Sequence, residues 1–127
     1  MKQETQTWLT LAEEDFQDSA LLWINHRYGA TIFASQQAIE KILKAYIIEF
    51  HSVMPPKTHR IELLLQEAKL VPILSTTILY EELSKAYIRV RYPDLNKQYF
   101  RKKEEVEPLF TLAKELYLWI KQQFNQH

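Results

Sequence analysis

The sequence predicts an all-α fold, an antiparallel up-down bundle of about five helices. The 127 residues include one glycine, Gly29, whereas the turns and bulges of β-proteins need many. Apolar side chains instead recur at the three- and four-residue intervals of an amphipathic helix along most of the chain. A chain of this length forms one core, so we expect a single domain over residues 1–127.

The first predicted helix covers roughly residues 4–25, with apolar side chains on one face and acidic side chains opposite. Residues 26–29, His-Arg-Tyr-Gly, form a short connector after it. We expect Gly29 to take the positive φ that ends many helices, because glycine has no Cβ to clash there. The chain then turns back into a second helix.

The central predicted helix covers residues 30–50, where apolar side chains occupy well over half of the circumference. Its polar positions are Gln36, Glu40, Lys41, Lys44 and Glu49. A loop must follow at Pro55-Pro56, because proline lacks the backbone N–H and restricts the residue before it.

Three further helices are predicted in the second half. A short one follows Thr58, whose spacing from Glu62 is close to a helix N-cap arrangement. Another follows Ser75 or Thr76 and stops at Tyr92-Pro93. The last begins near residue 104 and has a proline in its first turns, where the missing N–H matters little.

Charge is balanced overall and uneven locally. The 16 basic and 16 acidic residues give a formal net charge of zero, so attraction of nucleic acid to the whole surface is not expected. Basic residues nevertheless concentrate between residues 89 and 103, where Asp94 is the only acidic residue. They are Arg89, Arg91, Lys97, Arg101, Lys102 and Lys103. One end of one hairpin is therefore basic.

Several classes of chemistry lack support in the sequence. There is no cysteine for a disulfide or a thiolate metal site, and no two of the four histidines have metal-ligand spacing on a helix. One glycine cannot form a phosphate-binding loop, so we expect neither a metal nor a cofactor. No segment has the pattern of a signal peptide or a membrane span, and we expect a cytoplasmic location.

Two clusters remain as candidate sites. In Arg91-Tyr92-Pro93-Asp94 a guanidinium stands beside an aromatic ring and a carboxylate, which suits both base stacking and phosphate contact. Arg89 has the equal alternative of stabilising the end of its helix by its charge. His59, near Lys57, is either a surface or capping residue or a proton carrier near neutral pH.

Three passages together resemble the HEPN domain family. They are residues 28–45 (YGATIFASQQAIEKILKA), 57–65 (KTHRIELLL) and 87–94 (YIRVRYPD). The resemblance implies a helical bundle that commonly forms a homodimer. It also implies a partner, a minimal nucleotidyltransferase often encoded beside such proteins in two-component systems of toxin–antitoxin type. Nucleotide or RNA is the ligand class that the resemblance implies.

Many family members are metal-independent ribonucleases in which a histidine follows an arginine closely. At the corresponding positions after Arg91 this sequence has Asn96, Lys97 and Gln98. Our leading hypothesis is therefore a homodimer that binds a nucleotide, an RNA or the partner. The expected binding residues are Lys57, Arg89, Tyr92, Asp94 and Asn96, beside Arg91 and His59.

Two other functions stay open at this point. One is an endoribonuclease toxin in which Arg91 stabilises the phosphate, His59 transfers protons and Asn96 positions the substrate. The other is a structural adaptor without a ligand.

Overall fold

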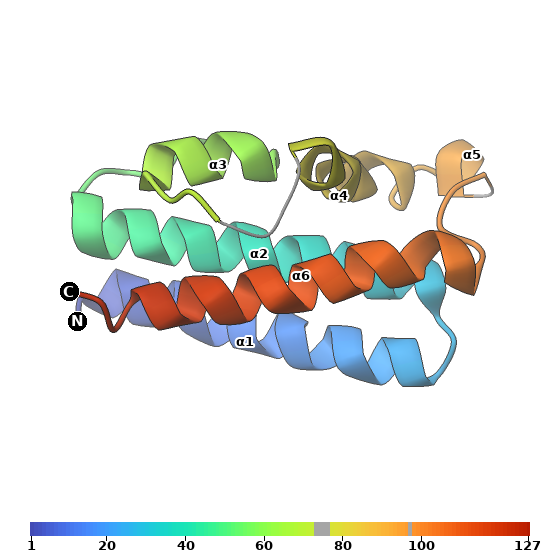
Figure 1. Ribbon diagram of the computed structural model, residues 1–127, viewed down its shortest axis with the longest axis horizontal. Helices are drawn as coiled ribbons and strands as arrows, with labels where there is room; N and C mark the ends of the chain where they lie inside the picture. The colour runs from blue at the N-terminus through green and yellow to red at the C-terminus, as the bar shows by residue number, and fades with distance from the viewer. Residues whose placement is uncertain (73–76, 97) are drawn as a thin grey trace.

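The computed structural model describes residues 1–72, 77–96 and 98–127, and within them it contains six helices and no strand (Figure 1). The helices are α1 (Gln3–Ile24), α2 (Tyr28–His51), α3 (Ile61–Ala68), α4 (Thr77–Arg89), α5 (Pro93–Asn96) and α6 (Lys103–Gln123). The predicted all-α fold is confirmed. Of the helices described, none is both long enough and apolar enough to cross a membrane.

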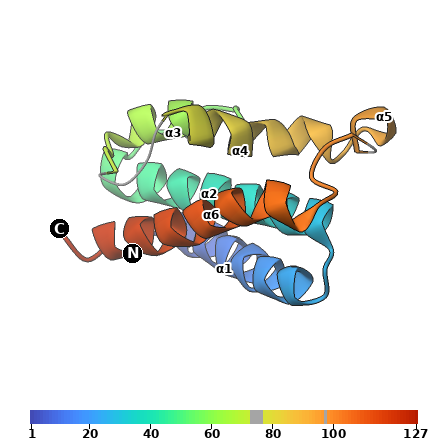
Figure 2. The same ribbon diagram turned by 45° about the vertical axis from the view of Figure 1, so that its right-hand side comes forward.

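Helix α2 is the centre of the bundle. Figures 1 and 2 show α3 and α4 on one side of it and α1 and α6 on the other. Helices α1 and α4 run in one direction along the bundle, and α2 and α6 run in the opposite direction. The fully buried side chains of α2 include Ile32, Ile39, Ile42, Leu43 and Ile47. Helices α1, α3, α4 and α6 all pack against this one helix.

The turn between α1 and α2 corrects one expectation. Gly29 lies inside the first turn of α2 and does not have a positive φ. His26 takes the left-handed conformation instead, with φ of 59°. The reversal occurs directly after Asn25, whose side-chain Nδ2 donates to the carbonyl of Leu21 at 2.8 Å. The chain thus turns before it reaches its glycine.

The described residues with positive φ are all non-glycine: His26, Ser52, Lys69 and Phe100. Three of them stand at or just beyond the ends of α1, α2 and α3. The fourth, Phe100, lies in the turn between α5 and α6 and is 2% exposed. These four reversals in the described chain therefore do without glycine, the residue that takes a positive φ most easily.

The start of α3 corrects a second expectation. Its N-cap residue is Arg60, which makes no side-chain capping bond, and Thr58 Oγ1 accepts only from the Arg60 backbone N–H at 3.2 Å. The first free N–H of the helix, that of Ile61, donates to Ser84 Oγ of α4 at 2.8 Å. The cap therefore comes from another helix. Ser75 and Thr76, expected to cap α4, lie outside the described residues.

Lys2 closes the far end of α2. Its Nζ donates to the carbonyl of Ile48 at 2.7 Å and to Ser52 Oγ at 2.8 Å, and its backbone N–H donates to Glu49 Oε1 at 3.1 Å. A cation at the carboxyl end of a helix satisfies free carbonyls and complements the helix dipole. The first residues of the chain are thereby fixed to the central helix.

Candidate functional site

His59 lies against a buried carboxylate of the central helix. Its Nδ1 is 2.9 Å from Glu40 Oε1, and the Glu40 residue is 5% exposed. Lys44 Nζ donates to the same oxygen at 2.9 Å. A carboxylate accepts and does not donate, so His59 Nδ1 carries the proton of this bond. In the neutral imidazole the lone pair then resides on Nε2, and the side chain is 46% exposed.

The second oxygen of Glu40 is also occupied. Gln36 Nε2 donates to it at 2.9 Å and Gln37 Nε2 at 3.2 Å. Gln36 Nε2 also donates to the backbone carbonyl of His59 at 2.9 Å, which fixes the loop that carries the histidine. The buried charge of Glu40 is therefore paired and fully hydrogen-bonded, as a carboxylate in a protein interior must be.

Gln36 and Glu40 were missed as site residues, because they were assigned only to the polar positions of the central helix. The structure buries both, Gln36 completely, under the loop that leads into α3. One signal in the sequence points to this arrangement. Gln36, Glu40 and Lys44 are spaced four residues apart, so they lie in one row on a helix that is otherwise largely apolar.

Tyr87 of α4 joins His59 to Arg91. The rings of His59 and Tyr87 are stacked, with centroids 3.5 Å apart and planes 11° apart. The Arg91 guanidinium lies over the same tyrosine ring, with Cζ 4.6 Å from its centroid. The fold thus brings together the two residues considered as catalytic candidates, which are far apart in the sequence. Tyr87 itself is half-buried.

Arg89 points elsewhere. Its Nη1 donates to Glu82 Oε2 at 3.1 Å, and its Cζ lies 4.0 Å from the centroid of the Tyr99 ring. Hydrogen bonds from Lys85 and then from Arg89 lower the pKa of Glu82 below its ordinary value. Arg89 therefore ties α4 to the turn that follows α5, whereas Arg91 is exposed beside Tyr87.

The remaining predicted binding residues lie within a few positions of His59 or Arg91 in the chain. Lys57 is exposed two positions before His59, and Tyr92, 59% exposed, follows Arg91 directly. Asp94 is exposed in the first turn of α5. The side chain of Asn96 lies outside the described residues. Within the described part of the chain, no group of three or more His, Asp or Glu residues is placed to hold a metal ion.

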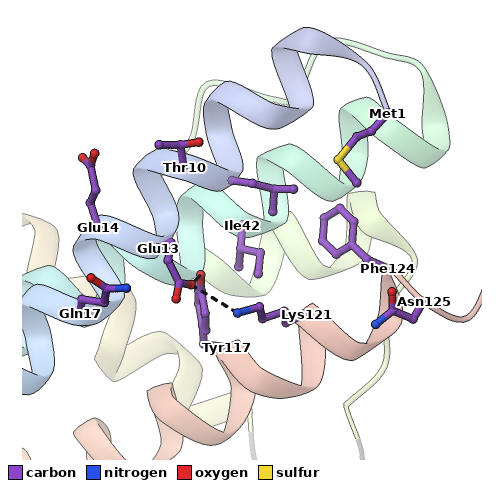
Figure 3. A pocket seen from close by; sticks show the side chains of 11 residues that line it. Met1, Thr10, Glu13, Glu14, Gln17, Ile42, Tyr117, Lys121, Phe124 and Asn125 are labelled. Atoms are coloured by element: carbon purple, nitrogen blue, oxygen red, sulfur yellow. Dashed lines mark hydrogen bonds and ion pairs between the residues drawn. The ribbon is translucent and has the colours of Figure 1, made fainter.

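A cavity of about 590 Å³ lies between α1 and α6, and Ile42 of α2 also lines it (Figure 3). The Tyr117 hydroxyl donates to Glu13 Oε2 there at 2.6 Å, and Lys121 Nζ is 3.6 Å from the same oxygen. This bond lowers the pKa of Glu13, while burial raises the pKa of Tyr117. With Glu13 and Glu14 on its wall, the cavity does not suit an anionic ligand such as a nucleotide.

The fold and the site define a small all-α domain whose exposed histidine is oriented by a buried carboxylate and placed beside an arginine. The chain belongs to the HEPN domain family, whose model matches residues 5–123. The family resemblance predicted from three short passages is therefore confirmed.

The structure is also similar to the crystal structure of the protein TT1696 from Thermus thermophilus. The TM-score is 0.73 at 24% sequence identity, and the match covers 95% of this chain and 98% of that chain. This similarity supports the same fold. A comparison with curated proteins found no match.

Proposed function

We propose that this chain is the nucleotide- or RNA-binding component of a nucleotidyltransferase–HEPN two-component system of the toxin–antitoxin type. Membership of the HEPN family supports a function related to nucleotides or RNA in general terms. The observation that carries the binding site is the common contact of His59 and Arg91 with the ring of Tyr87.

The chemistry of these groups favours a phosphate beside an unpaired base. A guanidinium binds two phosphate oxygens at once through paired N–H donors, and Arg91 is exposed for such a contact. The exposed ring of Tyr92, next in the chain, offers a face on which a base stacks, worth about 1–3 kcal/mol per base. Single-stranded RNA, with its splayed bases, fits this pairing better than a duplex.

Binding is tested by fluorescence anisotropy with a labelled single-stranded RNA, over a series of salt concentrations. Arg91→Ala is expected to weaken binding about tenfold and to reduce the slope of log affinity against log salt by about one. Lys114→Ala, which removes an exposed charge from α6, is the matched control and should bind as the wild type does. Equal affinity of Arg91→Ala and wild type would place the ligand elsewhere.

The proposed assembly is a homodimer that also binds the minimal nucleotidyltransferase. Ile88 and Tyr92 of the α4 region are 53% and 59% exposed and stand one helical turn apart, next to Arg91. Exposed apolar side chains in such a cluster are typical of an interface. Native mass spectrometry of the wild type and of Ile88→Glu tests the dimer, and co-purification with the co-expressed nucleotidyltransferase tests the partner. A monomeric wild type would refute the dimer.

A second candidate function is metal-independent RNA cleavage, which the Glu40–His59 contact favours. With its Nδ1 proton held by Glu40, neutral His59 has Nε2 free to take the proton of a ribose 2′-hydroxyl. The 2′-oxygen then bonds to the adjacent phosphorus, and Arg91 stabilises the added negative charge. The 5′-oxygen leaves and takes a proton from water, which yields a 2′,3′-cyclic phosphate and a 5′-hydroxyl.

Cleavage is separated from binding by incubating the protein with RNA in EDTA. The ribonuclease function requires 2′,3′-cyclic phosphate products that are lost in both Arg91→Ala and His59→Ala and retained in Lys114→Ala. Intact RNA, bound by the wild type, would leave the binding function alone.

A further inference from the structure

A second, smaller cavity of about 280 Å³ opens where the turn between α1 and α2 meets the carboxyl end of α4 and the turn before α6. The residues that line it are His26, Arg27, Tyr28, Gly29, Ala30, Val90, Phe100 and Arg101. Two of these side chains are permanently cationic, a third is a histidine, and none of the eight is a carboxylate. Among the cavities described, this one therefore suits an anion, in contrast to the acidic cavity beside Tyr117.

The basic residues of this cavity come from two segments of the chain, the turn before α6 and the turn between α1 and α2. Phe100 is 2% exposed and its left-handed backbone places Arg101 directly after a buried anchor. In the turn between α1 and α2, His26 Nδ1 lies 3.0 Å from the Tyr28 hydroxyl. Arg27, between these two residues, is exposed. Two segments that are far apart in the chain thus bring their basic side chains to one hollow.

The cavity is close in the chain to the proposed RNA site. Val90 lines it, and the next residue is Arg91, which lies over Tyr87. The preceding residue, Arg89, contacts the Tyr99 ring and so fixes the turn that carries Phe100 and Arg101 to the same end of α4. At the carboxyl end of α4, a residue that lines the cavity is thus followed directly by Arg91.

We propose that this cavity, the Arg27–Arg101 cavity, is an anion subsite that binds a second phosphate of an RNA strand already held at Arg91. The inference rests on the proposed function and refines it. It assigns an oligonucleotide as the ligand, because a mononucleotide has its phosphates at one position and cannot occupy both sites. Backbone phosphates held at two sites fix the course of a strand without reading its sequence.

The test compares two ligands on the same proteins. A fluorescent single-stranded RNA oligonucleotide and AMP are titrated against the wild type, the Arg27→Ala/Arg101→Ala double variant and Lys114→Ala. The double variant should bind RNA about tenfold more weakly, with a salt slope smaller by about one, because one phosphate contact is lost and each such contact releases about one counterion. Its affinity for AMP should equal that of the wild type, and Lys114→Ala should change neither.

Each result decides between the two proposals. Unchanged RNA affinity and salt slope in the double variant would overturn the subsite and leave the Arg91 site standing. An equal loss of AMP binding would also overturn it, because the cavity would then not be a separate site. Failure of the wild type to bind either ligand would overturn the proposed function together with the subsite. Arg27→Gln/Arg101→Gln, which keeps the length of both side chains nearer to that of arginine, repeats the test if the alanine variant unfolds.

Discussion

Replacement of Glu40 by glutamine tests whether the buried network determines the stability of the site. The wild-type carboxylate accepts from Lys44 and His59 at one oxygen and from two glutamine amides at the other. Glutamine has the same shape, but one of its two terminal groups is an NH2 donor. In either orientation of the amide, a donor therefore faces donors, and two of the four hydrogen bonds are lost.

The size of the effect follows from burial. An unsatisfied buried polar group costs about 1–3 kcal/mol, and breaking a buried ion pair costs about 3–5 kcal/mol. Lys44, whose side chain is 11% exposed, would also keep its charge without its partner. We expect Glu40→Gln to lower the free energy of unfolding by about 3 kcal/mol. The double variant Glu40→Gln/Lys44→Met should recover a substantial part of this free energy, because it removes the unpaired charge and keeps the aliphatic chain.

Urea denaturation followed by circular dichroism measures these differences, with unchanged m-values as the check on two-state unfolding. Glu82→Gln is the matched control, because Glu82 pairs with Lys85 and Arg89 near the surface and its side chain is 37% exposed. Glu82→Gln should lower the free energy of unfolding by less than about 1 kcal/mol. If Glu40→Gln were as mild as this control, the claim that the buried network supports the loop of His59 would be wrong.

Two further predictions concern stability alone. Burial raises the pKa of Tyr117 in the folded state. The contribution of protonated Tyr117 to the free energy of unfolding is therefore complete below about pH 10 and is lost as the pH rises further. Glu13 has a lowered pKa, so its contribution is present at neutral pH and is lost as the pH falls below about 4. Tyr117→Phe should flatten both limbs of the unfolding free energy against pH, and an unchanged profile would contradict the Glu13–Tyr117 hydrogen bond. Lys2→Met should lower the thermal midpoint by about 4 °C, because α2 loses its carboxyl-terminal cap, whereas Lys114→Met should not.

The long helices could be predicted from the sequence because their apolar periodicity extends over many turns. Predicted ranges of 4–25 and 30–50 compare with Gln3–Ile24 and Tyr28–His51 in the structure. Local signals at the helix ends were less reliable. Thr58 and Gly29 had the expected residue types for a cap and a reversal, but a serine from α4 and His26 took those roles. Tertiary contacts decided both positions.

The candidate site was predictable only in part. Its residues were identified by type, because arginine, tyrosine and histidine in short polar segments favour phosphate and base contact. Their meeting at Tyr87 depends on how the loop before α3 crosses α2, and no spacing within the sequence encodes that. The burial of Glu40 was not predicted because a glutamate on a helix is normally a surface residue, although its four-residue spacing from Gln36 and Lys44 was a signal.

The four reversals at His26, Ser52, Lys69 and Phe100 have a consequence for engineering. A side chain in the left-handed region costs about 1–2 kcal/mol relative to glycine. Protein engineers commonly replace glycines to increase stability. At these positive-φ positions, introducing glycine should increase the free energy of unfolding instead. Lys69 is exposed at the end of α3 and is the natural place to begin, whereas Ser52 Oγ accepts a hydrogen bond from Lys2 Nζ. In this nearly glycine-free sequence, thermal tolerance can be raised at turns that touch neither the core nor the proposed RNA path.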